Sequence, residues 1–382
     1  MLRFRLGAVA LLLSGLSLAL VAQTPEKKAD DKKPAETKPE DKKPVVPVVP
    51  PAGTPPVVPP AVTPPVATPP VTTPPVAVAA PQQFGLKLEK GKAFYQKLST
   101  TVSQTIKVQG GADLVQKHDQ TFFFKWLPIE QVADKWIVKE TIEGAKMTID
   151  IAGNQVKYDS TASTEGVGAN PGLADFFGKL VGSEFTVTFG KGMAIEKVDG
   201  REEFLKKLGG INNQMENILK KMLTEDALKQ MIDPTFGITP TKEIAVGESW
   251  EKTTTMSLGP IGSYELKNKY TYKGKDAVEK ELDRIEVAST LTYKAPTDQA
   301  DGLLFKIKGG ELKSMDPTAA DAAKNFVLYD PKAGRIAKSN LMVKMKGTLN
   351  VTIGGTDTTI DLYQEQTTTV ESKDSTFIEP KK

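Results

Sequence analysis

His118 is the only histidine in this sequence of 382 residues, which contains no cysteine. Histidine is the usual general base of enzymes, but nucleophilic catalysis also requires a nucleophile and an orienting carboxylate beside it. The sequence has no Gly-x-Ser-x-Gly motif that would present a serine. His118 stands in a polar run between two predicted strands, residues 116–120, and we interpret it as a solvated turn residue.

The sequence contains few residues of the types that bind metals or cofactors. Without cysteine there can be no disulfide, no thiolate zinc or iron–sulfur site and no lipid attached to a cysteine at the signal cleavage point. The glycines at 190, 192, 354 and 355 match no phosphate-binding loop, and we interpret them as hairpin turns. We therefore predict no catalytic residues, no cofactor and no metal site.

Carboxylates are the remaining side chains with catalytic potential, since the sequence has 47 Asp and Glu. Most of them alternate with lysine along predicted strands or stand at predicted helix starts, as on a solvated face. An exported hydrolase that uses paired carboxylates is therefore an alternative, but the least favoured one.

One run of aromatic residues could line an apolar ligand groove. Phe122, Phe124 and Trp126 share one face of a predicted strand by their period of two, and Trp136 follows in the next predicted strand. These four residues are the candidate apolar ligand face. The favoured alternative is that they form the core of a sheet packed against helices.

The N-terminal residues have the pattern of an export signal. Arg3 and Arg5 precede an apolar run that ends at Ala22, so residues 1–22 are predicted to be a signal peptide cleaved after Ala22. Because Leu20 is a poor residue for the cleavage site, an uncleaved membrane anchor is the alternative. The protein is predicted to be exported, and to be periplasmic, displayed at the cell surface or secreted.

A low-complexity linker follows at residues 23–83. Residues 26–43 hold seven lysines and six acids without a large apolar side chain, so they are predicted to be disordered. Of the 27 prolines, 18 fall within residues 25–81, and the tract 44–83 is predicted to adopt extended polyproline II conformation. This linker would be either a spacer that displays the rest of the chain or a passive connection.

Residues 84–382 are predicted to form a single α+β domain dominated by antiparallel sheet. Short helices are expected at 171–181, 201–208, 215–223 and 225–232, the last ending at Asp233 and Pro234. The strand blocks on either side of this helical segment suggest two similar β halves. The predicted strands are 121–127, 135–143, 147–151, 155–158, 185–189, 193–198, 250–258, 264–272, 282–293, 303–308, 326–329, 335–345, 349–353 and 358–370.

The predicted domain resembles an uncharacterised family of secreted bacterial proteins, a domain of unknown function of planctomycete type. The resemblance rests on LKLEKGKAFYQKL at 86–98, DFFGKLVGSEFTVTF at 175–189, EDALKQMIDPTFG at 225–237, VGESW at 246–250 and SLGPIGSY at 257–264. It implies one contiguous exported domain and supplies no activity or site residues.

The charge balance and the missing motifs favour a protein that binds rather than catalyses. Residues 84–382 hold 41 basic and 41 acidic side chains, which argues against a nucleic acid as partner. The first hypothesis is a non-enzymatic envelope protein that binds an apolar ligand, a lipid or a protein. The second is a structural or interaction module displayed on the proline-rich spacer. A membrane would be a partner only if the signal is uncleaved, and the oligomeric state stays open.

Overall fold

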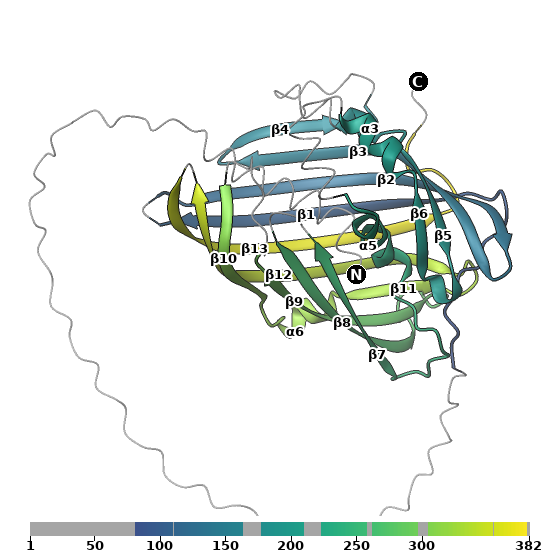
Figure 1. Ribbon diagram of the computed structural model, residues 1–382. Coiled ribbons are helices and arrows are strands. Elements are labelled where there is room, and N and C mark those ends of the chain that lie inside the picture. Colours follow the sequence, from purple (N-terminus) through teal and green to yellow (C-terminus); the bar gives the residue numbers. More distant parts are fainter. Residues whose placement is uncertain are drawn as a thin grey trace, which may run out of the picture. The chain divides into compact units, whose positions relative to one another are not determined.

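The computed structural model describes residues 81–109, 111–162, 177–209, 223–257, 262–296, 305–353 and 355–379. Within these ranges, strands dominate and the sheet they form is antiparallel throughout, as predicted (Figure 1). The strands are β1 (Phe94–Val108), β2 (Leu114–Val132), β3 (Lys135–Ile151), β4 (Asn154–Asp159), β5 (Glu184–Phe189), β6 (Ile195–Asp199), β7 (Ser249–Ser257), β8 (Ser263–Lys275), β9 (Asp283–Lys294), β10 (Phe305–Ser314), β11 (Phe326–Asp330), β12 (Arg335–Ile353) and β13 (Thr356–Lys373).

The order of strands shows how the chain runs through the sheet. That order is β6-β5-β3-β2-β1-β13-β12-β10-β9-β8-β7, with β4 on β3 and β11 between β9 and β12. The first six strands therefore run outward from β1 to the edge β6, and the last seven run from the opposite edge β7 back to β13. The first and last strands of the sheet pair at its centre, where Val102 faces Gln366.

The helical segment between the two strand blocks carries the chain from one edge of the sheet to the other. Its helices are α3 (Arg201–Gly209) and α5 (Glu225–Phe236), and α5 contacts β6, β7 and β12. Figure 1 shows α5 over one face of the sheet, which bends around it. A two-part strand arrangement around central helices is thus present. The strand of the first block that lies at the centre of the sheet is β1, the first in sequence. The central strand of the second block is β13, the last in sequence.

The face that bends around α5 carries the buried core, and the opposite face is polar. Along β1, buried and more exposed side chains alternate from Phe94 to Ile106. We call the buried side the inner face and the other side the outer face. Since alternate residues of a strand point to opposite faces, the register of the ladders fixes which inner-face residues are neighbours.

Several elements differ from their predicted bounds. The helix predicted at 225–232 continues through 234 to Phe236, and α6 (Ala319–Ala323), capped by Thr318, was not predicted. The helix predicted at 201–208 is confirmed as α3. Of the helix predicted at 171–181, residues 177–181 are described, and 177–180 are helical. All but Leu223 of the helix predicted at 215–223 lies outside the described residues.

Some predicted strands prove to be parts of longer ones. The predicted strand 121–127 is part of β2, which begins at Leu114. The strand β1 was not predicted. The strand β12 continues through Gly347, although two separate strands, 335–345 and 349–353, were predicted there. A side chain at Gly347 would collide with the carbonyl of Glu311 on β10, so this glycine allows the two strands to approach closely.

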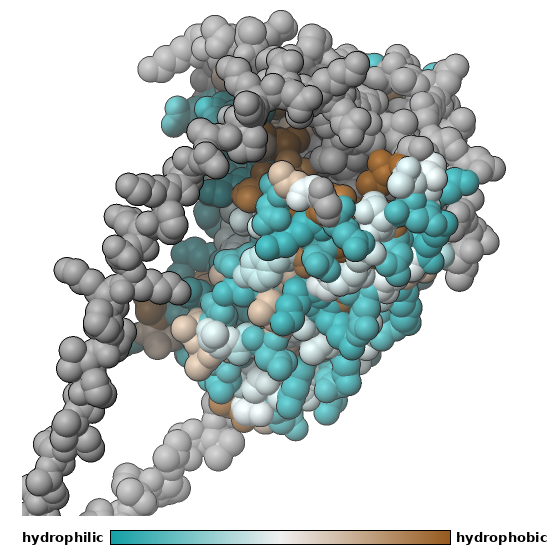
Figure 2. Space-filling model, turned by 90° about the vertical axis from the view of Figure 1, so that its left-hand side faces the viewer, coloured by the Kyte–Doolittle hydropathy of each residue, from teal (hydrophilic) through white to brown (hydrophobic). Residues whose placement is uncertain are grey.

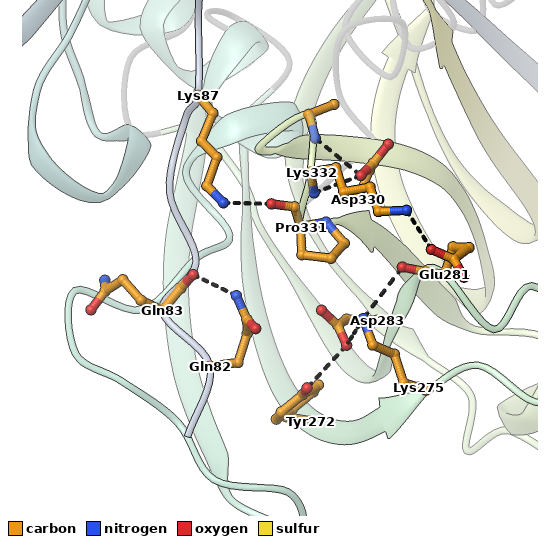
Figure 3. A network of polar contacts seen from close by, with 11 residues as sticks. Gln82, Gln83, Lys87, Tyr272, Lys275, Glu281, Asp283, Asp330, Pro331 and Lys332 are labelled. Carbon is orange, nitrogen blue, oxygen red and sulfur yellow. Dashed lines mark hydrogen bonds and ion pairs between the residues drawn. The ribbon is translucent and has the colours of Figure 1, made fainter. Parts of the chain in front are cut away.

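The chain before β1 is bound to the sheet. Gln82 forms an isolated bridge with Ile244, and Phe84 is fully buried among the rings of Trp250, Tyr272 and Tyr329. Figure 3 shows the same region, where Lys87 donates a hydrogen bond to the carbonyl of Pro331. In the described part of the chain, no helix has the length and apolar composition needed to cross a membrane.

Candidate functional site

The inner face of β2 changes character halfway along the strand. Its first half presents Gln116, His118 and Gln120, and its second half presents Phe122, Phe124 and Trp126. All six side chains are buried. The polar half is the more unusual, because buried polar side chains in proteins nearly always have hydrogen-bond partners.

The aromatic half is packed against its neighbours. The rings of Phe122 and Phe124 are stacked with centroids 6.1 Å apart, and the Trp126 ring lies 4.8 Å from Phe236 of α5. The ring of Phe94 on β1 is stacked with that of Trp126, and their centroids are 6.1 Å apart. In the described structure, these three candidate ligand-face residues are core residues, and Trp126 packs α5 against the sheet.

Trp136 lies apart from this group on β3 and is only partly buried. It faces Phe189 of β5 across the strand pair, and the Phe189 ring lies 6.2 Å from that of Trp126. The four predicted residues therefore share one face, with Phe189 between Trp136 and the other three.

A block of polar side chains lies on the inner face of the three central strands. The ladders place Gln104 of β1 between Gln116 and Gln364, and Thr100 between Gln120 and Thr368. Between these two rows lies a third, with His118 and Gln366 on either side of Val102. We call this block the polar island; its members are Thr100, Gln104, Gln116, His118, Gln120, Gln364, Gln366 and Thr368. None of them is more than 6% exposed.

Apolar residues surround the island on all four sides. Leu114, Ile106 and Leu362 form the row beyond Gln116, while Phe122, Leu98 and Val370 form the row beyond Gln120. The flanking residues of β3 and β12 are also apolar: Ile149, Ile151, Met147, Leu341, Val343 and Met345. The island is therefore a polar inclusion in an apolar face and does not continue into the polar outer surface.

The hydrogen bonds within the island are few and long. Gln364 donates to Gln366 at 3.3 Å, Gln366 donates to Thr368 at 3.4 Å, and His118 Nε2 lies 3.3 Å from Gln116 Oε1. Among the described residues, four buried atoms of the island have no hydrogen-bond partner: Gln104 Oε1, Gln116 Nε2, His118 Nδ1 and Gln364 Oε1.

His118 was predicted to be a solvated turn residue, and that prediction is wrong. It lies within β2, opposite Val102 and Ile149, and is 1% exposed. Burial lowers its pKa to about 4, and the neighbouring Asp119 opposes this shift only in part. The imidazole is therefore neutral near pH 7, and the whole island carries no charge.

The buried acids are held by structural partners. Asp283 accepts from Tyr272 Oη and Lys275 Nζ, both at 3.0 Å (Figure 3). The pKa of Asp276 is lowered by hydrogen bonds from backbone amides, first that of Glu279, and by Arg284 at 2.9 Å. In the ranges that the structure describes, no group of three or more His, Asp or Glu residues could hold a metal ion.

A groove of about 880 Å³ lies on the outer face. Several of its charged and polar groups have partners: Lys107 pairs with Asp113, Lys313 pairs with Glu311, and Thr348 donates to Asp361. The end of the molecule near the β12–β13 hairpin is similarly hydrophilic over most of its visible described surface (Figure 2), while apolar side chains gather toward the upper part of that view. The island, with its unpartnered buried atoms, is the stronger candidate.

Comparison with known proteins finds a domain of unknown function in part of the chain. A domain of a family of unknown function, DUF6263, is found over residues 133–315. This range begins before β3 and ends just after β10, so β1, β2 and β13, which carry the island, lie outside it. No curated protein matches the chain.

Similarities to solved structures are slight. Lipovitellin, from a study of its lipid–protein interactions, shares 9% identity over 78% of this chain, with a TM-score of 0.37. The chain spans 26% of lipovitellin. An outer membrane channel from Pseudomonas putida F1 shares 6% identity, with 77% of this chain and 100% of that chain covered and a TM-score of 0.22. Similarities at this level establish neither a ligand nor a fold.

Proposed function

We propose that this protein is a non-enzymatic binding protein that holds an apolar or amphipathic ligand against the inner face of its sheet, at the polar island. The observation that carries the proposal is the set of four unpartnered buried atoms on Gln104, Gln116, His118 and Gln364. A polar group buried without a partner costs about 1–3 kcal/mol, so four cost about 4–12 kcal/mol. That is comparable with the whole stability of a domain, about 5–15 kcal/mol. A bound molecule that completes these hydrogen bonds would offset this cost.

Native mass spectrometry of the full chain, purified without detergent from the cells that make it, tests this function. We expect a noncovalent adduct of lipid-like mass that is lost when the protein is denatured in organic solvent. In the double variant Gln104→Met/Gln364→Met, the adduct should be about tenfold less populated, because methionine keeps the volume of glutamine and removes its hydrogen bonds. A chain that carries no adduct would contradict the proposal.

Gln96→Met is the matched control. Gln96 is a buried glutamine on the same face of β1, with Phe124 and Ser372 as its cross-strand neighbours, and it lies outside the island. We expect this variant to keep the adduct. If Gln104→Met/Gln364→Met were more stable than the parent and kept the adduct, the island would be a hydrated structural feature and the proposal would be wrong.

The N-terminal sequence bears on where in the cell this function is carried out. We propose that residues 1–22 direct export and that 23–83 connect the binding domain to its site of action in the envelope or outside the cell. This proposal is supported by the basic residues Arg3 and Arg5, the apolar run that follows them and the proline-rich tract. N-terminal sequencing of the exported protein should give a mature chain that begins at Gln23.

A further inference from the structure

Resting on the binding function proposed above, we propose that the ligand is an uncharged lipid of the diacylglycerol type, in which a hydroxyl and ester carbonyls lie between hydrocarbon arms. The first argument is the charge of the site. The eight side chains of the island are uncharged, and their cross-strand neighbours on β3 and β12 are apolar.

The described structure offers no buried cation that could pair with an anionic lipid at the island. Among the described residues, the buried charged side chains are the acids Glu140, Asp276 and Asp283, and no lysine or arginine is buried. A phosphate or carboxylate brought to the island would therefore lose its hydration without gaining a counter-charge. Fatty acids and phospholipids are disfavoured on this ground.

The hydrogen-bonding capacity of the island requires both a donor and an acceptor on the ligand. Gln104 Oε1 and Gln364 Oε1 can only accept, and they face each other across β1 and β13. Gln116 Nε2 can only donate, and it lies on the other side of Gln104. A ligand hydroxyl can supply the donor, and an ester carbonyl can supply the acceptor.

The position of the island requires that these polar groups lie within the lipid rather than at its end. Three rows two residues apart span about 14 Å along the strands, and three strands span about 10 Å across them. Apolar rows lie beyond both ends, formed by Leu114, Ile106 and Leu362 on one side and by Phe122, Leu98 and Val370 on the other. A glycerol diester fits this pattern, since its polar centre carries hydrocarbon chains.

Competition against the neutral apolar fluorophore N-phenyl-1-naphthylamine, with the full chain, tests the ligand class. The competitors are 1,2-dioctanoylglycerol, its 3-acetate, dioctanoylphosphatidylglycerol, octanoate and hexadecane. We expect dioctanoylglycerol to compete best. The 3-acetate, which lacks the hydroxyl donor, should be about 5- to 10-fold weaker, and the anionic lipids should be about 100-fold weaker.

Binding measurements on variants test whether these ligand preferences arise from the island. Gln104→Met/Gln364→Met should remove the preference for dioctanoylglycerol over its acetate and leave hexadecane binding within about twofold, whereas Gln96→Met should retain the preference. Equal or tighter binding of the anionic lipids would overturn the assigned ligand class and leave the binding function standing. If neither the fluorophore nor any competitor bound, and the chain carried no adduct, both proposals would fail.

Discussion

The phenolic oxygen of Tyr329 binds both backbone groups of Gly85, a residue 244 positions earlier in the chain. It accepts a hydrogen bond from the Gly85 nitrogen at 3.1 Å and donates one to the Gly85 carbonyl at 2.6 Å. The adjacent Phe84 is fully buried, with its ring 5.0 Å from that of Tyr329. The first residues of the predicted domain are therefore held in the fold.

Replacing Phe84 with alanine should lower the free energy of unfolding by about 3–5 kcal/mol, because it leaves a cavity among three aromatic rings. Urea unfolding of the full chain followed by tryptophan fluorescence measures this change, since Trp250 lies beside Phe84. Val278→Ala, at a position that is 88% exposed, is the control and should change stability by less than about 0.5 kcal/mol. A loss below about 1 kcal/mol for Phe84→Ala would show that residues 81–89 are only loosely attached.

Acid should destabilise the protein through His118. Its folded pKa of about 4 lies below its unfolded value, 6.5, so the unfolded chain binds this proton more tightly. The stability that this pKa difference contributes is fully present above pH 6.5. It is lost as the pH falls toward 4, which lowers the free energy of unfolding by about 3 kcal/mol in total. Unfolding curves of the parent and of His118→Gln at pH 7 and pH 4 should show this difference, because the carboxylates titrate alike in both.

The pKa of His118 can also be measured directly, because it is the only histidine in the sequence. The imidazole signals in proton NMR belong to this residue alone. Their chemical shifts should stay constant from pH 8 to about 5 and change only below that. A titration midpoint near 6.5 would mean that the ring is solvated, and it would contradict the conclusion that the island is buried and uncharged.

Tyr272→Phe should cost about 1.5–3 kcal/mol of stability. The mutation removes one of the two groups that bind the buried Asp283 carboxylate and leaves Lys275 as the other. Thermal unfolding with a measured enthalpy gives the change. Tyr363→Phe, at an exposed tyrosine, should be neutral, and equal effects of the two mutations would contradict a structural role for the Tyr272–Asp283 bond.

The sheet and the aromatic half of the site could be predicted from sequence periodicity. Phe122, Phe124 and Trp126 recur with a period of two, which is the spacing of side chains on one face of a strand. The same alternation continues backward through Gln120, His118 and Gln116. Polar residues at alternate positions are also found in solvated loops, so the pattern alone could not show that these side chains point inward.

The polar island depends on a pairing that no local pattern reveals. Gln104 meets Gln364 because the first and last strands of the sheet are neighbours. Contacts between residues so far apart in sequence are set by tertiary packing. The buried position of His118 could therefore be recognised only once the neighbours of β2 on both sides were known.

Gly347→Ala should be the most damaging single methyl addition within β12. Gly347 pairs with Leu312, and the methyl would collide with the carbonyl of Glu311, which belongs to the β10 backbone and cannot rotate away. Separating the strands would break ladder hydrogen bonds between β10 and β12, at a cost of about 2–4 kcal/mol. Gly309→Ala on β10 is the matched control, since its added methyl meets no atom within 4 Å. Amide hydrogen exchange should show faster exchange along β10 in Gly347→Ala than in Gly309→Ala. If exchange were unchanged in both variants, the close approach of β10 to Gly347 would not constrain the sheet.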